Sequence, residues 1–294
     1  MNAKSTTKDT KNTKAFLLTV VCFVSVACFV VASQPRPQRI ISLVPALTEM
    51  LFAIGAGPQV VAVSSYDEYP PDVKTLPRVG ALLDPDTERI IALKPDLLIT
   101  YGSQVDLQAQ MKRAGIPTFD YRHAGLAHIL VTITELGART GHATQAGRVI
   151  AAIEARLAAV RVRVAGRHRP RTLLVFSREP KALRNMFVSG GHGFLHDMLE
   201  IAGGDNVFSD IDQESVQVST ETILARAPAV ILELRPEDIP DGQPMRDELA
   251  SWSRLASVPA VRNRRVHVIA GQAVTVPGPR VAESVERMAK ALHP

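Results

Sequence analysis

Two histidines, His192 and His196, stand four residues apart in the segment SGGHGFLHD (189–197), with Asp197 beside the second. On a helix this spacing would place both imidazoles on one face, an arrangement that suits a metal ion. No other histidine or cysteine of the chain has a ligand-like spacing. We therefore predict that the protein has no metal site of its own.

The glycines of the same segment do not form a nucleotide-binding loop. They have neither the G-x-G-x-x-G order nor a P-loop lysine. No Ser-His-acid set can be proposed from the spacing of the chain's residues. We therefore predict that the chain is not an enzyme and needs no cofactor. The alternative from a different class is an exported α/β hydrolase, which an assay with ester substrates would identify.

A phrase of the sequence occurs twice. TERIIALKPDLLIT (87–100) returns in altered form as TETILARAPAVILEL (220–234), and Glu88 and Glu221 hold the same place in the two copies. Each copy predicts a helix followed by a buried strand, with the glutamate near the helix N-terminus, where the helix dipole favours negative charge. A capping role explains one copy well. Two equivalent copies indicate a duplicated helix-strand unit, one in each half of the chain.

Short aliphatic runs alternate with amphipathic ones from residue 39 onward, which is typical of an α/β protein with largely parallel sheets. The expected strands are 39–45, 60–65, 96–101, 116–121, 172–177, 229–234 and 265–270. The expected helices are 46–56, 86–95, 106–115, 193–204, 220–228, 245–258 and 279–292.

One longer helix interrupts this alternation between His142 and Ala165. Apolar residues recur there at steps of three and four, which predicts a single apolar stripe on a rod roughly 36 Å long. We therefore predict two Rossmann-like lobes joined by one long rigid helix. The expected boundaries are 39–140 for the N-terminal lobe, 141–168 for the interdomain helix and 169–294 for the C-terminal lobe. The apolar stripe consists of Ile150, Ile153, Leu157, Val160 and Val164.

The first 33 residues predict export. Four lysines precede an uncharged apolar run of 18 residues, from Ala15 to Ala32, and small residues follow it. This pattern is typical of a signal peptide, and the run is also just long enough for an uncleaved membrane anchor. Both cysteines, Cys22 and Cys28, lie in this run, so the body uses no disulfide. The formal charge of +5 is modest, and no nucleic-acid motif is present.

Several segments resemble the periplasmic substrate-binding proteins of ABC importers for corrinoids, haem and iron-siderophores, and the cobalamin-binding members most of all. The resemblance covers about residues 39–292. It implies a ligand cleft between two lobes, a periplasmic location, a monomer, and an ABC permease with its ATPase as partners. It also implies that Glu88 and Glu221 dock onto permease arginines, which would fix orientation through charge-assisted bonds. The segments that carry it are RIISLVPALTEMLFAIGA, VVAVSSYDEYPP, DTERIIALKPDLLIT, FVSGGHGFLHDMLEIAGGDNVFSD, VQVSTETILARAP and GPRVAESVERMAKAL.

The resemblance also implies ligand-binding residues. Tyr66, Phe176 and Phe187 match aromatic residues that line the cleft of the cobalamin binder. Leu82 and Ser215 stand where the family has tryptophans, and a late polar pair falls near Gln272 and Val276. Half of the aromatic box is therefore missing, so the chain departs from the pattern of the cobalamin binder. The aromatic residues that remain fit a large flat or apolar-faced ligand.

Three alternatives remain open for the ligand. A bare metal ion would use His192 and His196, and haem would use Tyr66 or His192 as an axial ligand. A ferric siderophore is the third. The basic residues Arg178, Lys181 and Arg184 would meet ligand carboxylates or belong to a solvated loop.

Overall fold

The computed structural model describes residues 36–237, 239 and 242–294. The expected signal peptide or anchor at residues 1–33 therefore lies outside the described residues. Residues 37–294 form one compact unit, with two β-sheets along the chain. Within the described residues, no helix is both long and apolar enough to cross a bilayer.

The first sheet is parallel throughout, with strand order β2-β1-β3-β4. Pro45, whose fixed φ suits a first helical turn, begins the first helix directly after β1. The buried strands and helices match the sequence prediction to within a few residues. The strands are β1 Ile40–Ser42, β2 Val60–Val63, β3 Leu97–Tyr101 and β4 Thr118–Tyr121, and the helices are α2 Pro45–Ala53, α3 Thr87–Ala92 and α4 Val105–Arg113.

The second sheet is mixed. Its order is β10-β9-β5-β6-β8, with β7 beside β5. Strand β6 runs antiparallel to both of its neighbours, while β5, β9 and β10 are parallel. The sequence predicts largely parallel sheets, and it does not predict strands β6 and β8. The strands are β5 Arg171–Ser177, β6 Met186–Ser189, β7 Asp205–Asn206, β8 Ser215–Val218, β9 Val230–Arg235 and β10 Val266–Ala270.

The helices of the second half begin close to where the sequence predicts them, with one exception. The expected helix 245–258 is broken after residue 250, where a 3-10 segment follows. The hydroxyls of Ser251 and Ser253 donate to carbonyls three residues back, which competes with regular helical bonding. The helices are α7 Phe194–Ile201, α8 Thr220–Arg226, α9 Gln243–Ala250, α10 Pro259–Arg262 and α11 Val281–Leu292, and the 3-10 segment is Ser251–Leu255.

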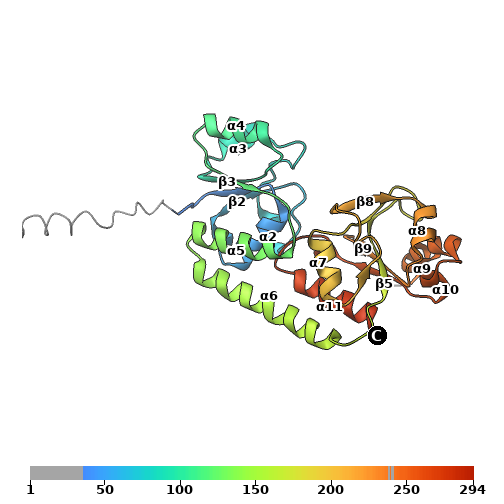
Figure 1. Cartoon of the computed structure of the whole chain (residues 1–294). Coiled ribbons are helices and arrows are strands. Elements are labelled where there is room, and N and C mark those ends of the chain that lie inside the picture. Colours follow the sequence, from blue (N-terminus) through green and yellow to red (C-terminus); the bar gives the residue numbers. More distant parts are fainter. Residues whose placement is uncertain (1–35, 238, 240–241) are drawn as a thin grey trace, which may run out of the picture. The chain divides into compact units, whose positions relative to one another are not determined.

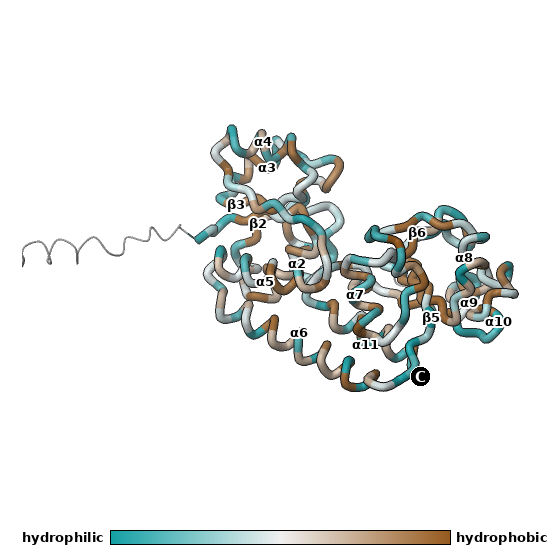
Figure 2. The backbone as a smooth tube through the Cα atoms, in the orientation of Figure 1, coloured by the Kyte–Doolittle hydropathy of each residue, from teal (hydrophilic) through white to brown (hydrophobic). Residues whose placement is uncertain are grey.

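The chain passes from the first sheet to the second once, through two helices. The second of these, α6 Ala143–Val164, is the expected long helix, and its 22 residues span about 33 Å. Its predicted stripe is buried or half-buried, and hydrophobic residues recur along it in Figure 2. The first, α5 Leu126–Thr140, was not predicted and ends at Gly141, whose φ of +83° suits glycine.

Helix α6 packs against both α5 and α11, which lie along the same side of it in Figure 1. Arg156 of α6 pairs with Glu286 of α11, with Nη2 and Oε2 2.8 Å apart. One hydrophobic core runs from the first sheet through α2, α5, α6, α7 and α11 to the second sheet. The division into lobes at 39–140, 141–168 and 169–294 remains our proposal, as does the rigidity of α6.

Candidate ligand-binding cleft

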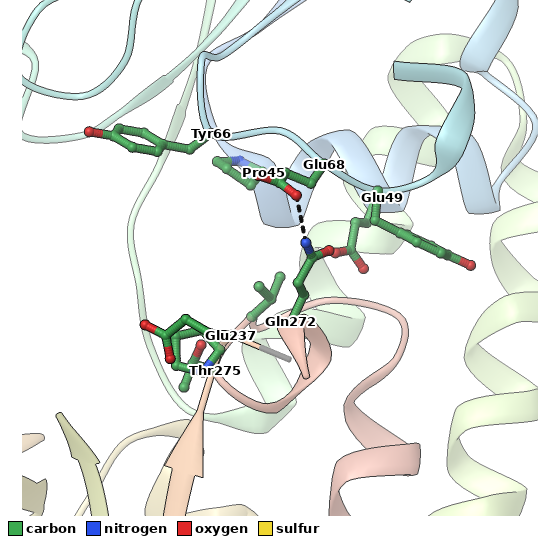
Figure 3. A pocket seen from close by; sticks show the side chains of 10 residues that line it. Pro45, Glu49, Tyr66, Glu68, Glu237, Gln272 and Thr275 are labelled. Carbon is green, nitrogen blue, oxygen red and sulfur yellow. Dashed lines mark hydrogen bonds between the residues drawn. The ribbon is translucent and has the colours of Figure 1, made fainter. Parts of the chain in front are cut away.

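A pocket of about 450 Å³ lies where the carboxyl ends of strands from both sheets meet. This is the place where open α/β sheets usually bind ligands, and the volume is that of a small-molecule site. Figure 3 shows its side chains converging from the two halves of the chain. The lining residues are Pro45, Glu49, Tyr66, Glu68 and Tyr69 from the first half, and Pro236, Glu237, Gln272, Thr275 and Val276 from the second.

A second pocket of about 480 Å³ adjoins the first and shares Pro45 and Tyr66 with it. The Tyr66 side chain separates the two spaces and is 74% exposed, which is unusual for a large aromatic residue. An exposed ring at the junction of two pockets is suited to stacking on a flat ligand. The second pocket is lined by Leu43, Pro45, Ser64, Tyr66, Leu82, Leu83, Asp84 and Tyr101.

Two polar contacts bridge the halves across the first pocket. Gln272 Nε2 donates to Glu68 Oε2 at 2.8 Å, which Figure 3 shows crossing the cleft. Deeper inside, Arg280 donates to both oxygens of Glu49, at 2.8 and 2.5 Å, and its guanidinium lies 3.9 Å from the ring centroid of Tyr69. Burial raises the pKa of the Glu49 carboxyl, and the bond from Arg280 opposes that rise. The fork of two bonds is the strong form of an arginine-carboxylate pair.

Another acid, Asp67, stands between the lining residues Tyr66 and Glu68 in the sequence and is buried. The Ser64 backbone N–H donates to its Oδ2 at 2.8 Å. Burial raises the pKa of Asp67 to about 7, while Thr48, the Ser64 N–H and Arg78 lower it and Glu49 adds to the rise. Burial, followed by the nearby Asp67 charge, also raises the pKa of the Tyr101 hydroxyl.

The ligand residues implied by resemblance fall into two groups in the structure. Tyr66 and Gln272 line the first pocket, and Leu82 lines the second. Phe176 and Phe187 are half-buried with ring centroids 6.5 Å apart, and they line neither pocket. The remaining residue, Ser215, is exposed at the start of β8. A contact between these residues and the ligand stays a prediction.

Sequence reasoning missed most of the lining residues, among them Glu49, Tyr69 and Glu237. Glu49 lies within a helix whose other residues are mostly apolar, so it carries no signal of a cleft. Glu237 stands two residues after a buried strand, and polar residues at that position are a recognisable signal in α/β folds. Its position could have been found by that rule alone.

Arg178 has neither of the roles considered from the sequence. Its side chain is fully buried and pairs with Glu233 at 2.9 Å and Glu248 at 2.7 Å. Both acids also pair with Arg235, and Trp252 Nε1 donates to Glu233. This network of ion pairs links α9 to β9 and to the residue that follows β5. The Arg178 guanidinium is therefore not available to bind a ligand carboxylate.

Of the other two basic residues of that loop, Lys181 lies near Asp247 and Arg184 near Glu179, both at the surface. For these two the solvated-loop interpretation fits.

The helical metal spacing expected for His192 and His196 is wrong. Helix α7 begins at Phe194, so His192 precedes it and the two histidines do not share a helix face. His192 Nδ1 lies 3.2 Å from Asp212, whereas His196 Nδ1 lies 3.2 Å from Asn206. Asp197 instead accepts the backbone N–H of Leu126 at 2.7 Å, across the two halves.

Glu88 and Glu221 are both exposed in the first turn of their helices. Neither is the capping residue. Asp86 caps α3 and Ser219 caps α8, each through its side chain. A hydrogen bond with the Ser219 side chain lowers the pKa of Glu221, which keeps that carboxylate ionised. The simple capping explanation of the repeated glutamate is therefore incomplete.

The chain belongs to the periplasmic binding protein family, which its residues 40–273 match. It is 33% identical over 197 residues to a vitamin B12-binding protein of Yersinia pestis, covering 66% of this chain and 69% of the relative. The expected family and the two-lobe α/β fold are confirmed.

Two solved structures show the same likeness. One is the periplasmic vitamin B12-binding protein BtuF of Vibrio cholerae, with a TM-score of 0.74, 27% identity, and coverage of 87% of this chain and 96% of that one. The other is the periplasmic haem-binding protein RhuT of a Roseiflexus species, with a TM-score of 0.72, 27% identity, and coverage of 87% and 98%.

Proposed function

We propose that the chain is the substrate-binding component of an ABC importer that captures a corrinoid in the cleft and delivers it to a membrane permease. The observation that carries the proposal is the pair of adjoining pockets at the carboxyl ends of both sheets, with the exposed Tyr66 between them. The likeness to vitamin B12-binding proteins supports the ligand class. The body would be exported to the periplasm and act as a monomer, with no cofactor and no catalytic step.

Delivery would depend on two exposed acids. Glu88 and Glu221 follow the capping residues of equivalent helices in the two halves. A carboxylate in each half, meeting a guanidinium of the permease, would set the orientation of docking and speed the encounter.

A haem or iron-siderophore ligand is the second candidate. The observation that favours haem is the exposed phenol of Tyr66 in the cleft, since a tyrosine oxygen can serve as an axial ligand. The haem-binding relative supports the same class.

Ligand binding by the 34–294 chain tests the proposal. Cyanocobalamin, haemin and a ferric siderophore absorb visible light, so equilibrium dialysis and native mass spectrometry can follow each one. We expect a one-to-one complex with the corrinoid, weakened by Tyr66→Ala. The single tryptophan is a poor reporter, because Trp252 is buried in the second core and bonded to Glu233. Absence of corrinoid binding at micromolar concentrations would reject the ligand.

A further inference from the structure

The charged side chains described in the lining of the cleft are all acidic. Among the described residues that line the two pockets, four are carboxylates and none is a lysine, arginine or histidine. A site built for a carboxylate-bearing ligand usually supplies arginine or lysine donors. The four carboxylates are Glu49, Glu68, Glu237 and Asp84.

Three arginines that contact or adjoin lining residues are committed to other groups of the protein. Arg280 is held by both oxygens of Glu49. Arg78 Nη1 donates to the backbone oxygens of Ser64 at 2.8 Å and Asp67 at 2.6 Å. Deeper in the second half, Arg235 is buried and paired with Glu233 and Glu248. None of these guanidiniums can turn to a ligand without breaking a buried or half-buried contact.

Of the four carboxylates, only Glu49 pairs with a cation within the described part of the chain. Asp84, which lines the second pocket, is one of the other three, and the remaining two line the first. Glu68 and Glu237 are exposed and face the first pocket from opposite halves of the chain (Figure 3). Within the described residues, no ion pair joins either of them to a cation. Glu68 accepts one hydrogen bond, from the neutral amide of Gln272. The negative charges of both groups therefore act on a ligand in the cleft, screened by the water that reaches these exposed side chains.

We propose that Glu68 and Glu237 are specificity-determining residues, which make the cleft accept metal chelates with a neutral or cationic rim and reject those that carry carboxylates. This inference rests on the proposed function and narrows its substrate class. A corrin whose side chains are amides satisfies the condition. Haem, with two propionates, and carboxylate-rich ferric siderophores do not.

The test compares two ligands that share the corrin ring and differ in the charge of its side chains. Diaquacobinamide is a cationic corrin with amide side chains, and cobyrinic acid is the same ring with carboxylates in their place. Equilibrium dialysis of the 34–294 chain, read by corrin absorbance, gives both dissociation constants. We expect diaquacobinamide to bind at least about tenfold more tightly, since several like charges act together at short range. The preference should shrink between roughly 0.01 M and 0.15 M salt, as the screening length falls from about 30 Å to about 8 Å.

Glu68→Gln and Glu237→Gln keep the shape of the side chains and remove the charges. Each substitution should reduce the ratio of the two dissociation constants by about fivefold, and the double variant should reduce this ratio further. The matched control is Glu154→Gln on the exposed face of α6, which should leave the ratio unchanged. Circular dichroism spectra check that the variants remain folded.

The outcomes separate this inference from the function on which it rests. Tight binding of cobyrinic acid or haemin, or an unchanged ratio in the double variant, would overturn the charge selection and leave an importer receptor intact. Binding of no corrinoid, haemin or ferric chelate by the wild type would overturn both.

Discussion

At the scale of single residues, the cleft combines exposed groups that can meet a ligand with buried acids that set its stability. Tyr66, Gln272 and Leu82 follow from resemblance to a known family and do line the pockets. Glu49 could not be predicted, because its partner Arg280 is 231 residues away and no local pattern links them. The same holds for Arg178, since its burial depends on two acids brought in by another strand and another helix.

Asp67 should make stability depend on pH. Its folded-state pKa of about 7 lies above the ordinary 3.8, so between these values the folded protein holds a proton that the unfolded chain has lost. The contribution of Asp67 is therefore full below about pH 4 and is lost as the pH rises to about 7. Asp67→Asn stays neutral, so its unfolding free energy relative to wild type should increase over this window. The increase is at most about 4 kcal/mol, at about 1.4 kcal/mol per pKa unit.

Urea unfolding at pH 4.5 and pH 7.5 measures this difference. Comparing variant with wild type removes the slopes of other acids, such as Glu286, whose pKa is lowered by its hydrogen bond with Arg156. Glu154→Gln, an exposed substitution, should show no such change. A variant whose relative stability is the same at both pH values would contradict the raised pKa.

At the scale of elements, the sequence predicts the helices and strands whose hydrophobic residues recur with a clear period. It does not predict the elements whose structure depends on packing against other parts of the fold. Helix α5 contains the β-branched run Val131–Thr134, which lowers helix propensity. It is a helix nevertheless, because Ile129, Ile133 and Leu136 are buried on one face. Strands β6 and β8 were not predicted, although the predicted strand β2 is equally short, because neither MFVS nor SVQV is a continuous run of aliphatic residues as VVAV is.

The α5–α6 pair depends on one glycine. A Cβ at Gly137 would lie well inside contact distance of the Ala146 Cβ, across the two helices. Gly137→Ala should therefore destabilise the protein by about 1–2 kcal/mol, because the clash outweighs a gain in helix propensity of at most about 1 kcal/mol.

Gly147 supplies the matched control within α6. A Cβ there meets nothing within 4 Å, so Gly147→Ala should stabilise by about 0.5–1 kcal/mol. Thermal or urea unfolding of both variants checks the signs. Two variants of equal stability would show that the helices separate freely at this point.

At the scale of the whole molecule, the repeated helix-strand phrase predicts two similar halves, and the fold has them. What it does not predict is how firmly the halves are joined. One hydrophobic core extends through both. Glu49–Arg280 and Asp197–Leu126 cross between them, and Arg156–Glu286 ties α6 to α11. These contacts form only when distant segments meet, so no local pattern indicates them.

These contacts between the two halves predict that the cleft closes little when a ligand binds. A continuous helix and a shared core have no loop hinge, so the radius of gyration should fall by less than about 1 Å when the corrinoid binds. Small-angle scattering of the 34–294 chain with and without ligand measures the change. A contraction of several ångströms would mean that the contacts across the cleft open in the free protein.

The last prediction concerns docking of the whole receptor. Glu88 and Glu221 are exposed and do not cap their helices, so Glu→Arg at either position should leave folding and ligand affinity nearly intact, within about 0.5 kcal/mol. At a permease surface that presents arginines, each reversal places like charges together, which costs several kcal/mol and should abolish uptake. Transport by the reconstituted importer, measured beside ligand binding by the isolated receptor, separates the two effects. Glu154→Arg on α6 has the same charge change away from both helices and should transport normally. If the Glu88→Arg and Glu221→Arg double variant transports as well as wild type, the repeated glutamate reflects duplication of the fold and has no role in docking.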